Sequence, residues 1–184
     1  MGSARYSTGG MPTRPTSERC IAVVGPGEDA TADAIADAET LGRLLAGHGW
    51  VTLCGGRAAG VMAAAARGVS VAGGVVIGLL PGTDRSDAAP GLTAALPTGL
   101  REARNAVLVT AADAVIGCGL SPGTASELAL ALRAAKPTAL VRPTHDADEF
   151  FRSLAGDAPF HVAATPLAAV EWVARQLRLE APRG

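Results

Sequence analysis

A regular alternation of two kinds of segment constrains the fold of this chain more than any other feature. Short runs of apolar, β-branched residues alternate with longer stretches rich in alanine and leucine. The runs VVIGLL and AVIGC are apolar without a polar residue at every second position, a pattern typical of strands that are buried on both faces. Such strands form parallel sheets with helices on each side. The alternation therefore predicts an α/β protein.

These segments predict one doubly wound, Rossmann-like domain over residues 20–180, with a mainly parallel sheet flanked by helices and a disordered polar leader at 1–19. Strands are predicted at Cys20 to Val24, Val51 to Cys54, Val75 to Leu80, Ala114 to Cys118, Thr138 to Val141 and His161 to Ala163. Helices are predicted at about 32–47, 58–68, 98–111, 122–135, 146–154 and 166–178. In such a sheet, ligands bind beyond the C-terminal ends of the strands, near the point where strand order reverses.

Composition and charge exclude several classes of function. The 16 basic and 17 acidic residues nearly cancel, so no overall field attracts nucleic acid or an anionic membrane. Aromatic residues make up only 3%, which argues against platforms that stack bases. No apolar run approaches the roughly 20 residues that span a bilayer, and no signal peptide is visible. We expect a cytoplasmic protein without nucleic-acid or membrane partners.

Neither the cysteines nor the histidines have the spacing of a metal site. The residues concerned are Cys20, Cys54, Cys118, His48, His145 and His161. The cysteines are odd in number and widely spaced, which predicts buried, reduced thiols. We therefore expect no metal and no resident cofactor.

Three glycine-rich loops follow predicted strands and meet at one edge of the predicted sheet. They contain Gly25 and Gly27, then Gly55 and Gly56, then the run GCGLSPGT over residues 117–124. Glycine lets the backbone approach a ligand closely, and helix N-termini offer free N–H groups and partial positive charge. Together the loops predict a site for a phosphate group.

The first loop, GPGEDA, formally fits the dinucleotide-binding pattern GxGxxA. However, Pro26 lacks an N–H donor, and Glu28 and Asp29 would repel a pyrophosphate. No acidic residue ends the second strand, where one would bind a ribose. We therefore do not expect NAD as the cofactor.

The third loop opens an amphipathic helix, and two interpretations of its polar residues stay open. Thr124 and Glu127 have the spacing of a capping box, which by itself would account for both. Alternatively the helix start binds an anion together with a second group, for which Arg104 is the candidate. Arg104 could instead pair with a neighbouring acid near Glu102.

The run from Arg104-Asn105 through Asp113-Ala114 to GLSPGTASE, ending at Glu127, resembles the LONELY GUY (LOG) superfamily. That family carries Arg-Lys, then Ala-Asp-Ala before a strand, then P-G-G-x-G-T-x-x-E. The run LCGGRAAGVMAAAARG is also similar to the family's G-G-G-x-x-G-L-M loop, so the resemblance covers roughly residues 21–141. The chain departs from the pattern where GLS replaces P-G-G and Asn105 replaces lysine. These departures are closer to a small branch to which molybdenum cofactor carrier proteins are similar.

The resemblance implies a function and a set of site residues. LOG enzymes hydrolyse the N-glycosidic bond of a nucleoside 5′-monophosphate, giving free base and ribose 5-phosphate. Arg104 and Glu127 would carry this chemistry, because a carboxylate can stabilise an oxocarbenium-like state. The alternative is a non-catalytic carrier of a nucleotide or a phosphorylated, molybdopterin-type cofactor. Either protein would be a homodimer or larger. The residues implied to hold the phosphate are Gly119, Ser121, Gly123 and Thr124.

Members of this superfamily were long labelled lysine decarboxylases, and the sequence argues against that activity. Pyridoxal phosphate chemistry needs a lysine for its Schiff base. The only lysine, Lys136, lies in a predicted turn at the opposite edge of the sheet from the glycine loops. A separate question left open is whether the Pro- and Gly-rich segment 81–97 forms a lid.

Overall fold

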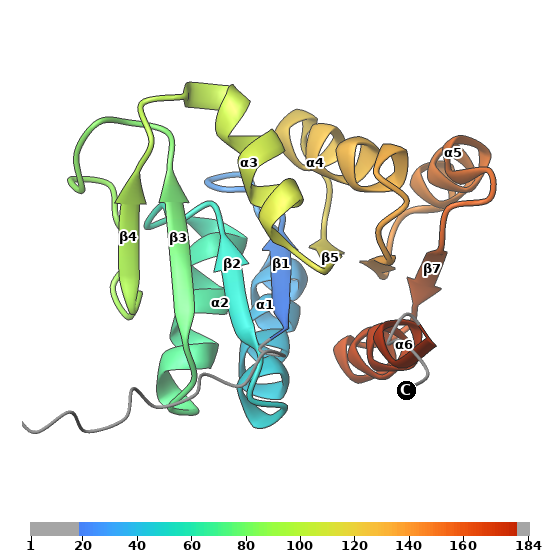
Figure 1. The fold of residues 1–184 in the computed structure, drawn as a ribbon, viewed down its shortest axis with the longest axis horizontal. Helices are drawn as coiled ribbons and strands as arrows, with labels where there is room; N and C mark the ends of the chain where they lie inside the picture. The colour runs from blue at the N-terminus through green and yellow to red at the C-terminus, as the bar shows by residue number, and fades with distance from the viewer. Residues whose placement is uncertain (1–18, 180–184) are drawn as a thin grey trace, which may run out of the picture.

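The computed structural model describes residues 19–179, and the strands of this part form a single seven-stranded parallel sheet (Figure 1). The strands are β1 (Cys20–Val24), β2 (Val51–Cys54), β3 (Val76–Leu80), β4 (Ala94–Pro97), β5 (Ala114–Cys118), β6 (Thr138–Val141) and β7 (Phe160–Ala163). The helices are α1 (Ala32–Gly47), α2 (Gly60–Val71), α3 (Arg104–Ala111), α4 (Pro122–Arg133), α5 (His145–Ala155) and α6 (Pro166–Leu179). The predicted Rossmann-like α/β fold is confirmed.

The order of the strands creates the point at which ligands bind in such folds. The sheet runs β4-β3-β2-β1-β5-β6-β7, and every neighbouring pair is parallel. The chain extends from β1 through β2 and β3 to β4, and then returns to place β5 on the other side of β1. The order therefore reverses between β1 and β5, and this switch point is where a crevice opens beyond the strand ends.

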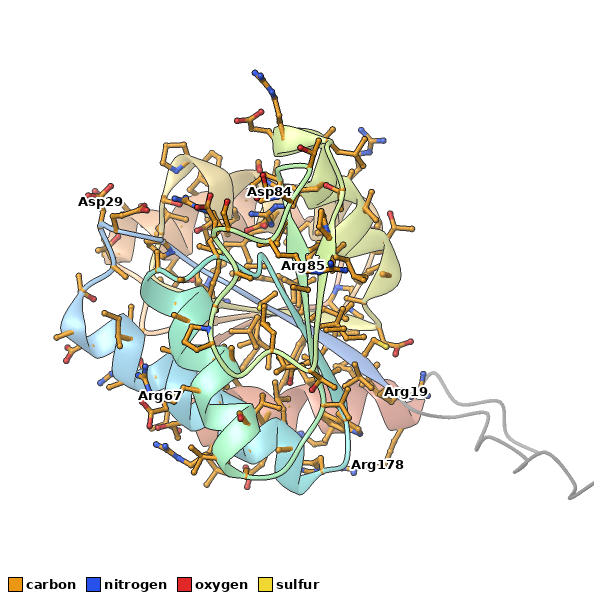
Figure 2. The ribbon with its side chains drawn as sticks, turned by 90° about the vertical axis from the view of Figure 1, so that its left-hand side faces the viewer. Arg19, Asp29, Arg67, Asp84, Arg85 and Arg178 are labelled. Atoms are coloured by element: carbon orange, nitrogen blue, oxygen red, sulfur yellow. The ribbon has the colours of Figure 1, made fainter. Side chains whose placement is uncertain are left out.

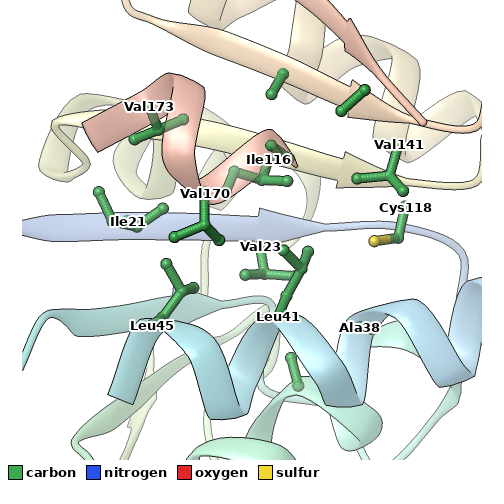
Figure 3. Packing of buried hydrophobic residues seen from close by; sticks show 14 of the residues in the cluster. Ile21, Val23, Ala38, Leu41, Leu45, Ile116, Cys118, Val141, Val170 and Val173 are labelled. Carbon is green, nitrogen blue, oxygen red and sulfur yellow. The ribbon is translucent and has the colours of Figure 1, made fainter. Parts of the chain in front are cut away.

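The two faces of the sheet are covered by different helices, as the apolar strands require. In β1, Ile21 and Val23 face the layer of α1, α2 and α6, whereas Ala22 and Val24 face the layer of α3, α4 and α5. Figure 3 shows Ile21 beside Leu45 and Val23 beside Leu41, both leucines of α1. Because successive strand side chains point to opposite faces, a strand covered on both sides lacks the regular alternation of apolar and polar residues.

Three alanines of the run AAAARG in α2 belong to the core. Ala64, Ala65 and Ala66 are buried, the first two of them in the cluster that includes α1. Close approach of α1 and α2 depends on glycine, since a Cβ on Gly68 would lie 2.1 Å from the carbonyl oxygen of Glu39. This face of α2 is therefore used within the chain, and the expected homodimer stays a prediction.

Sequence analysis missed the edge strand β4. It lies within the Pro- and Gly-rich segment 81–97, is only partly buried, and ends in Pro97, which an edge strand tolerates because one of its sides is unpaired. The preceding residues are fixed to the β2 loop, where the N–H of Ala58 donates to Asp87 and that of Ala89 donates to Gly56. The helix predicted at 98–111 begins later in the structure: a 3-10 turn spans 101–103, and α3 follows it.

The edge of the sheet opposite the glycine loops is held by polar contacts. The ammonium of Lys136 donates to the carbonyls of Thr110 and Ala112, and a carboxylate oxygen of Asp113 accepts from the N–H of Cys20 at 2.7 Å. Lys136 thus has a structural role far from the glycine loops. Arg19 donates to the carbonyl of Leu177, while the rest of the predicted leader lies outside the described residues.

The three cysteines differ in how deeply they are buried. Cys54 and Cys118 are buried, and burial raises the pKa of each thiol, to about 11 and about 12, so both are neutral. Cys20 is only partly buried, because it begins β1 at the rim of the sheet, and the prediction that it is buried was wrong.

Within residues 19–179, no helix has the length and apolar character needed to cross a membrane.

Candidate functional site

A cavity of about 150 Å³ lies at the switch point, beyond the C-terminal end of β1. The loops after β1 and β2 and the first turns of α2, α3 and α4 form its wall. The lining residues are Val23, Val24, Gly25, Gly27, Gly55, Arg57, Met62, Arg104, Asn105, Ser121, Gly123, Thr124 and Glu127. The structure therefore brings together eight of the ten residues predicted for the site.

An ion pair stands in the wall of this cavity. Nη1 of Arg104, in the first turn of α3, donates to Oε1 of Glu127 on α4 at 3.0 Å. Both side chains are largely buried, with 12% and 8% of their surfaces exposed. Nε of Arg104 is also buried, and within the described part of the chain it has no hydrogen-bond partner. Among the described residues, the alternative pair of Arg104 with an acid near Glu102 does not form, because Arg104 turns inward to Glu127.

The environment of Glu127 sets its protonation near neutral pH. Burial raises the pKa of its carboxyl to about 7, and the Arg104 guanidinium opposes that rise without cancelling it. A carboxyl with such a pKa can hold or release a proton at physiological pH. Titratable groups shifted in this way and placed in a cleft are typical of functional sites.

Packing requires one glycine of the predicted site, and a second leaves room for the Arg104 and Met62 side chains. A Cβ on Gly25 would lie 2.4 Å from the carbonyl oxygen of Cys118, so β1 can pass into its loop only with glycine there. A Cβ on Gly55 would lie 2.7 Å from Nη2 of Arg104 and 2.6 Å from Sδ of Met62. Gly55 therefore leaves the space that the Arg104 guanidinium occupies in the cavity.

Helix α4 begins with a different cap from the one the T-x-x-E spacing suggested. Ser121 is the N-cap, its Oγ accepting the N–H of Thr124 at 3.2 Å, and Pro122 follows at the first helical position. The Ser121 and Thr124 hydroxyls also share a hydrogen bond of 2.9 Å. Thr124 thus lies inside the first turn and Glu127 pairs with Arg104, so the capping-box interpretation was wrong.

Asn105 connects the two helices that carry the ion pair. Its side-chain amide donates to Oγ of Ser126 at 3.0 Å, and that hydroxyl donates to the carbonyl of Gly123 at 2.7 Å. The amide therefore fixes α3 against the first turn of α4, at the position where the LOG pattern has lysine. Sequence analysis noted Asn105 only as a departure from that pattern.

Arg57 and Met62 also line the cavity and were missed. Both stand in the run GGRAAGVM, of which only Gly55 and Gly56 were predicted as site residues. Arg57 directly follows the glycine pair after β2, and a cation at the C-terminal end of a strand was a signal that could have found it. Met62 stands at the methionine of the LOG loop pattern, which was a signal for it, although an apolar residue in α2 is equally expected in the core.

Gly56 and Gly119, predicted for the site, do not line this cavity. Gly56 has φ +77° and passes so close to β3 that a Cβ would lie 2.9 Å from the Cα of Gly78. Gly119 lines a neighbouring cavity of about 180 Å³ at the start of α1. There the guanidinium of Arg142 donates to Oδ2 of Asp37 at 2.6 and 3.0 Å.

Fold and cavity together define a nucleotide- or cofactor-binding protein of the LOG-like class. The model of the SLOG cluster4 family matches residues 18–170, and the chain belongs to that family. The similarity to the LOG superfamily and to molybdenum cofactor carrier proteins, predicted from the sequence, is confirmed.

Three relatives illustrate the similarity. The molybdenum cofactor binding protein from the phototrophic bacterium Rippkaea orientalis is 37% identical, with a TM-score of 0.85 over 89% of this chain and 99% of that one. The Moco carrier protein from Chlamydomonas reinhardtii is 38% identical, with a TM-score of 0.83 over 89% and 99% of the two chains. An uncharacterized protein of Archaeoglobus fulgidus is 36% identical over 128 residues, covering 67% of this chain and 80% of that protein.

Proposed function

We propose that this protein binds a phosphorylated cofactor of the molybdopterin type in the switch-point cavity and serves as its carrier. The observation that carries the proposal is that Arg104 and the first turn of α4 meet in one glycine-lined cavity. The molybdenum cofactor binding and carrier proteins of similar sequence and fold support this class of ligand.

The α4 end of the cavity supplies what a phosphoryl group requires. The N–H of Gly123 lies in the first turn of α4, where backbone N–H groups have no intrahelical acceptor. It belongs to the positive end of the helix dipole. Ser121 and Thr124 share one hydrogen bond between two hydroxyls, which leaves one hydroxyl proton to donate. Arg104 adds positive charge to the same wall of the cavity.

The enclosed volume of the cavity indicates which part of a ligand it holds. About 150 Å³ is smaller than the roughly 300 Å³ at which small-molecule pockets begin. The enclosed space therefore suits a phosphoryl group and the atoms next to it, with the remainder of the ligand outside. Such a partly enclosed ligand suits a carrier, which must release its cargo.

A second function, hydrolysis of a nucleoside 5′-monophosphate to free base and ribose 5-phosphate, is favoured by the Arg104 and Glu127 pair in the cavity. A carboxylate beside the anomeric carbon stabilises the oxocarbenium-like transition state and orients the attacking water. The pKa of about 7, which burial gives Glu127, suits proton transfer at neutral pH. Arg104 would assist the departing base or bind the phosphate.

Two assays on the same preparation separate the two functions. Equilibrium titration measures binding of isolated molybdenum cofactor and of a panel of nucleoside 5′-monophosphates, and chromatography detects free base. Binding of the cofactor without base release supports the carrier. Base release that disappears in Glu127→Ala, while binding persists, supports the hydrolase. Failure to bind any phosphorylated ligand contradicts both.

A further inference from the structure

A second guanidinium reaches the cavity from its open side. Arg57 lines the cavity, and its Nη2 donates to Oε1 of Glu28 at 2.7 Å. Its Nη1 lies 3.9 Å from where a Cβ on Gly27 would be, which places the guanidinium beside the loop after β1. The pair is exposed, with 38% of the Arg57 side chain and 68% of the Glu28 side chain accessible.

The two ion pairs of the cavity differ in the free energy that is needed to separate their side chains. Taking Arg104 from Glu127 breaks a hydrogen bond between two largely buried side chains and leaves the guanidinium buried without its partner, which is strongly unfavourable. Taking Arg57 from Glu28 leaves that carboxylate in water, where exposed ion pairs contribute little to stability. Only the Arg57 guanidinium can therefore exchange its carboxylate for a ligand at low cost.

We propose that Arg57 is the exchangeable anchor of this site, its guanidinium leaving Glu28 to bind the phosphoryl group of the ligand. The proposal rests on the proposed function, because it assumes that a phosphorylated ligand enters the cavity. In the absence of ligand, Glu28 occupies the position of the anion and keeps Arg57 beside the cavity. Glu28, which in the sequence argued against a pyrophosphate, thus competes with the ligand for the Arg57 guanidinium.

The exchange selects for phosphorylated ligands over singly charged ones. The Glu28 carboxylate carries one negative charge, whereas a phosphate monoester carries about 1.5 to 2 and presents three acceptor oxygens to the planar guanidinium. A monocarboxylate ligand would gain nothing over Glu28, while a phosphate gains both charge and hydrogen bonds. Glu28 therefore acts against weakly charged ligands.

Titration calorimetry with inorganic phosphate, at constant ionic strength, tests this exchange. We expect Arg57→Ala to weaken phosphate binding by about tenfold or more, as loss of a charge-assisted hydrogen bond does. We expect Glu28→Gln to strengthen binding by about two- to fivefold, the range of an exposed ion pair. Thermal melting confirms that each variant is folded.

Two control variants carry the same changes of charge at other positions. Asp29→Asn removes a negative charge from the next residue of the same loop, and Arg67→Ala removes a guanidinium from α2, where it pairs with Glu39 (Figure 2). Both should change phosphate affinity by less than about twofold, because exposed charges are screened.

Equal effects of Glu28→Gln and Asp29→Asn, or of Arg57→Ala and Arg67→Ala, would overturn the exchange and leave the proposed function standing. Absence of phosphate binding by the wild-type protein would overturn both.

Discussion

Replacing Glu127 with glutamine should change how the stability of the protein depends on pH. Burial raises the pKa of this carboxyl from its ordinary value of 4.5 to about 7 in the folded protein. The folded state therefore binds a proton more tightly than the unfolded chain does. Its contribution to stability is fully present below pH 4.5 and is lost as the pH rises towards 7.

The size of this effect follows from the two pKa values. A tenfold change in proton affinity corresponds to about 1.4 kcal/mol, so raising the pKa from 4.5 to about 7 removes about 3 kcal/mol of unfolding free energy by pH 8. Most of the loss, about 2 to 3 kcal/mol, falls between pH 5 and pH 8. Glutamine has a similar shape and does not titrate, so the variant lacks this contribution.

Urea denaturation of the wild type and of Glu127→Gln at pH 5, 6, 7 and 8 measures the difference. The other titrating groups are common to both proteins and cancel in the comparison. We expect the wild type to lose about 2 to 3 kcal/mol relative to the variant across this range. Parallel stability curves would show that the carboxyl titrates alike in the folded and unfolded states, and would refute the reasoning.

Two further substitutions test how the ion pair is positioned. Gly55→Ala places a Cβ 2.7 Å from Nη2 of Arg104 and 2.6 Å from Sδ of Met62, so ligand affinity measured by calorimetry should fall at least about tenfold as the guanidinium is displaced. Unchanged affinity would show that Arg104 does not contact the ligand. Asn105→Ala removes the hydrogen bond to Ser126 and should lower the free energy of unfolding in urea by about 1 kcal/mol; no loss would mean that this contact does not hold α3 against α4.

Much of the fold was predictable because the buried strands have a recognisable sequence pattern. Six strands were located within one residue of their bounds, since a strand covered on both faces is a continuous apolar run. The strand β4 was missed for the same reason, because it lies at the edge, half exposed, and has no such run. Its pairing with β3 is a tertiary contact that local sequence does not encode.

The candidate site was predicted in part, through positions fixed by the fold. Arg104 and Glu127 are far apart in sequence, but each stands in or near the first turn of a helix that begins at the same sheet edge. The capping-box alternative for Thr124 and Glu127 stayed open in the sequence because spacing alone cannot tell an N-cap from a residue inside the first turn. Ser121 competes for the cap, and Arg104 competes for the carboxyl of Glu127.

Binding of a phosphoryl group at the first turn of α4 underlies the proposed function, and the Gly123→Ala variant tests that binding. Within 4 Å, a Cβ at Gly123 would meet only Oγ of Ser121, at 3.8 Å, so the structure accommodates it. Alanine within a helix should stabilise the fold by about 0.5 to 1 kcal/mol. The added methyl group would nevertheless occupy space in the cavity that Gly123 lines.

The measurement is the affinity of wild type and Gly123→Ala for isolated molybdenum cofactor, with thermal melting of both proteins. We expect an equal or higher melting temperature together with at least about a tenfold loss of affinity, since the methyl group keeps the phosphoryl group from the N–H at the helix start. Unchanged affinity in the stable variant would contradict it and place the ligand elsewhere on the protein.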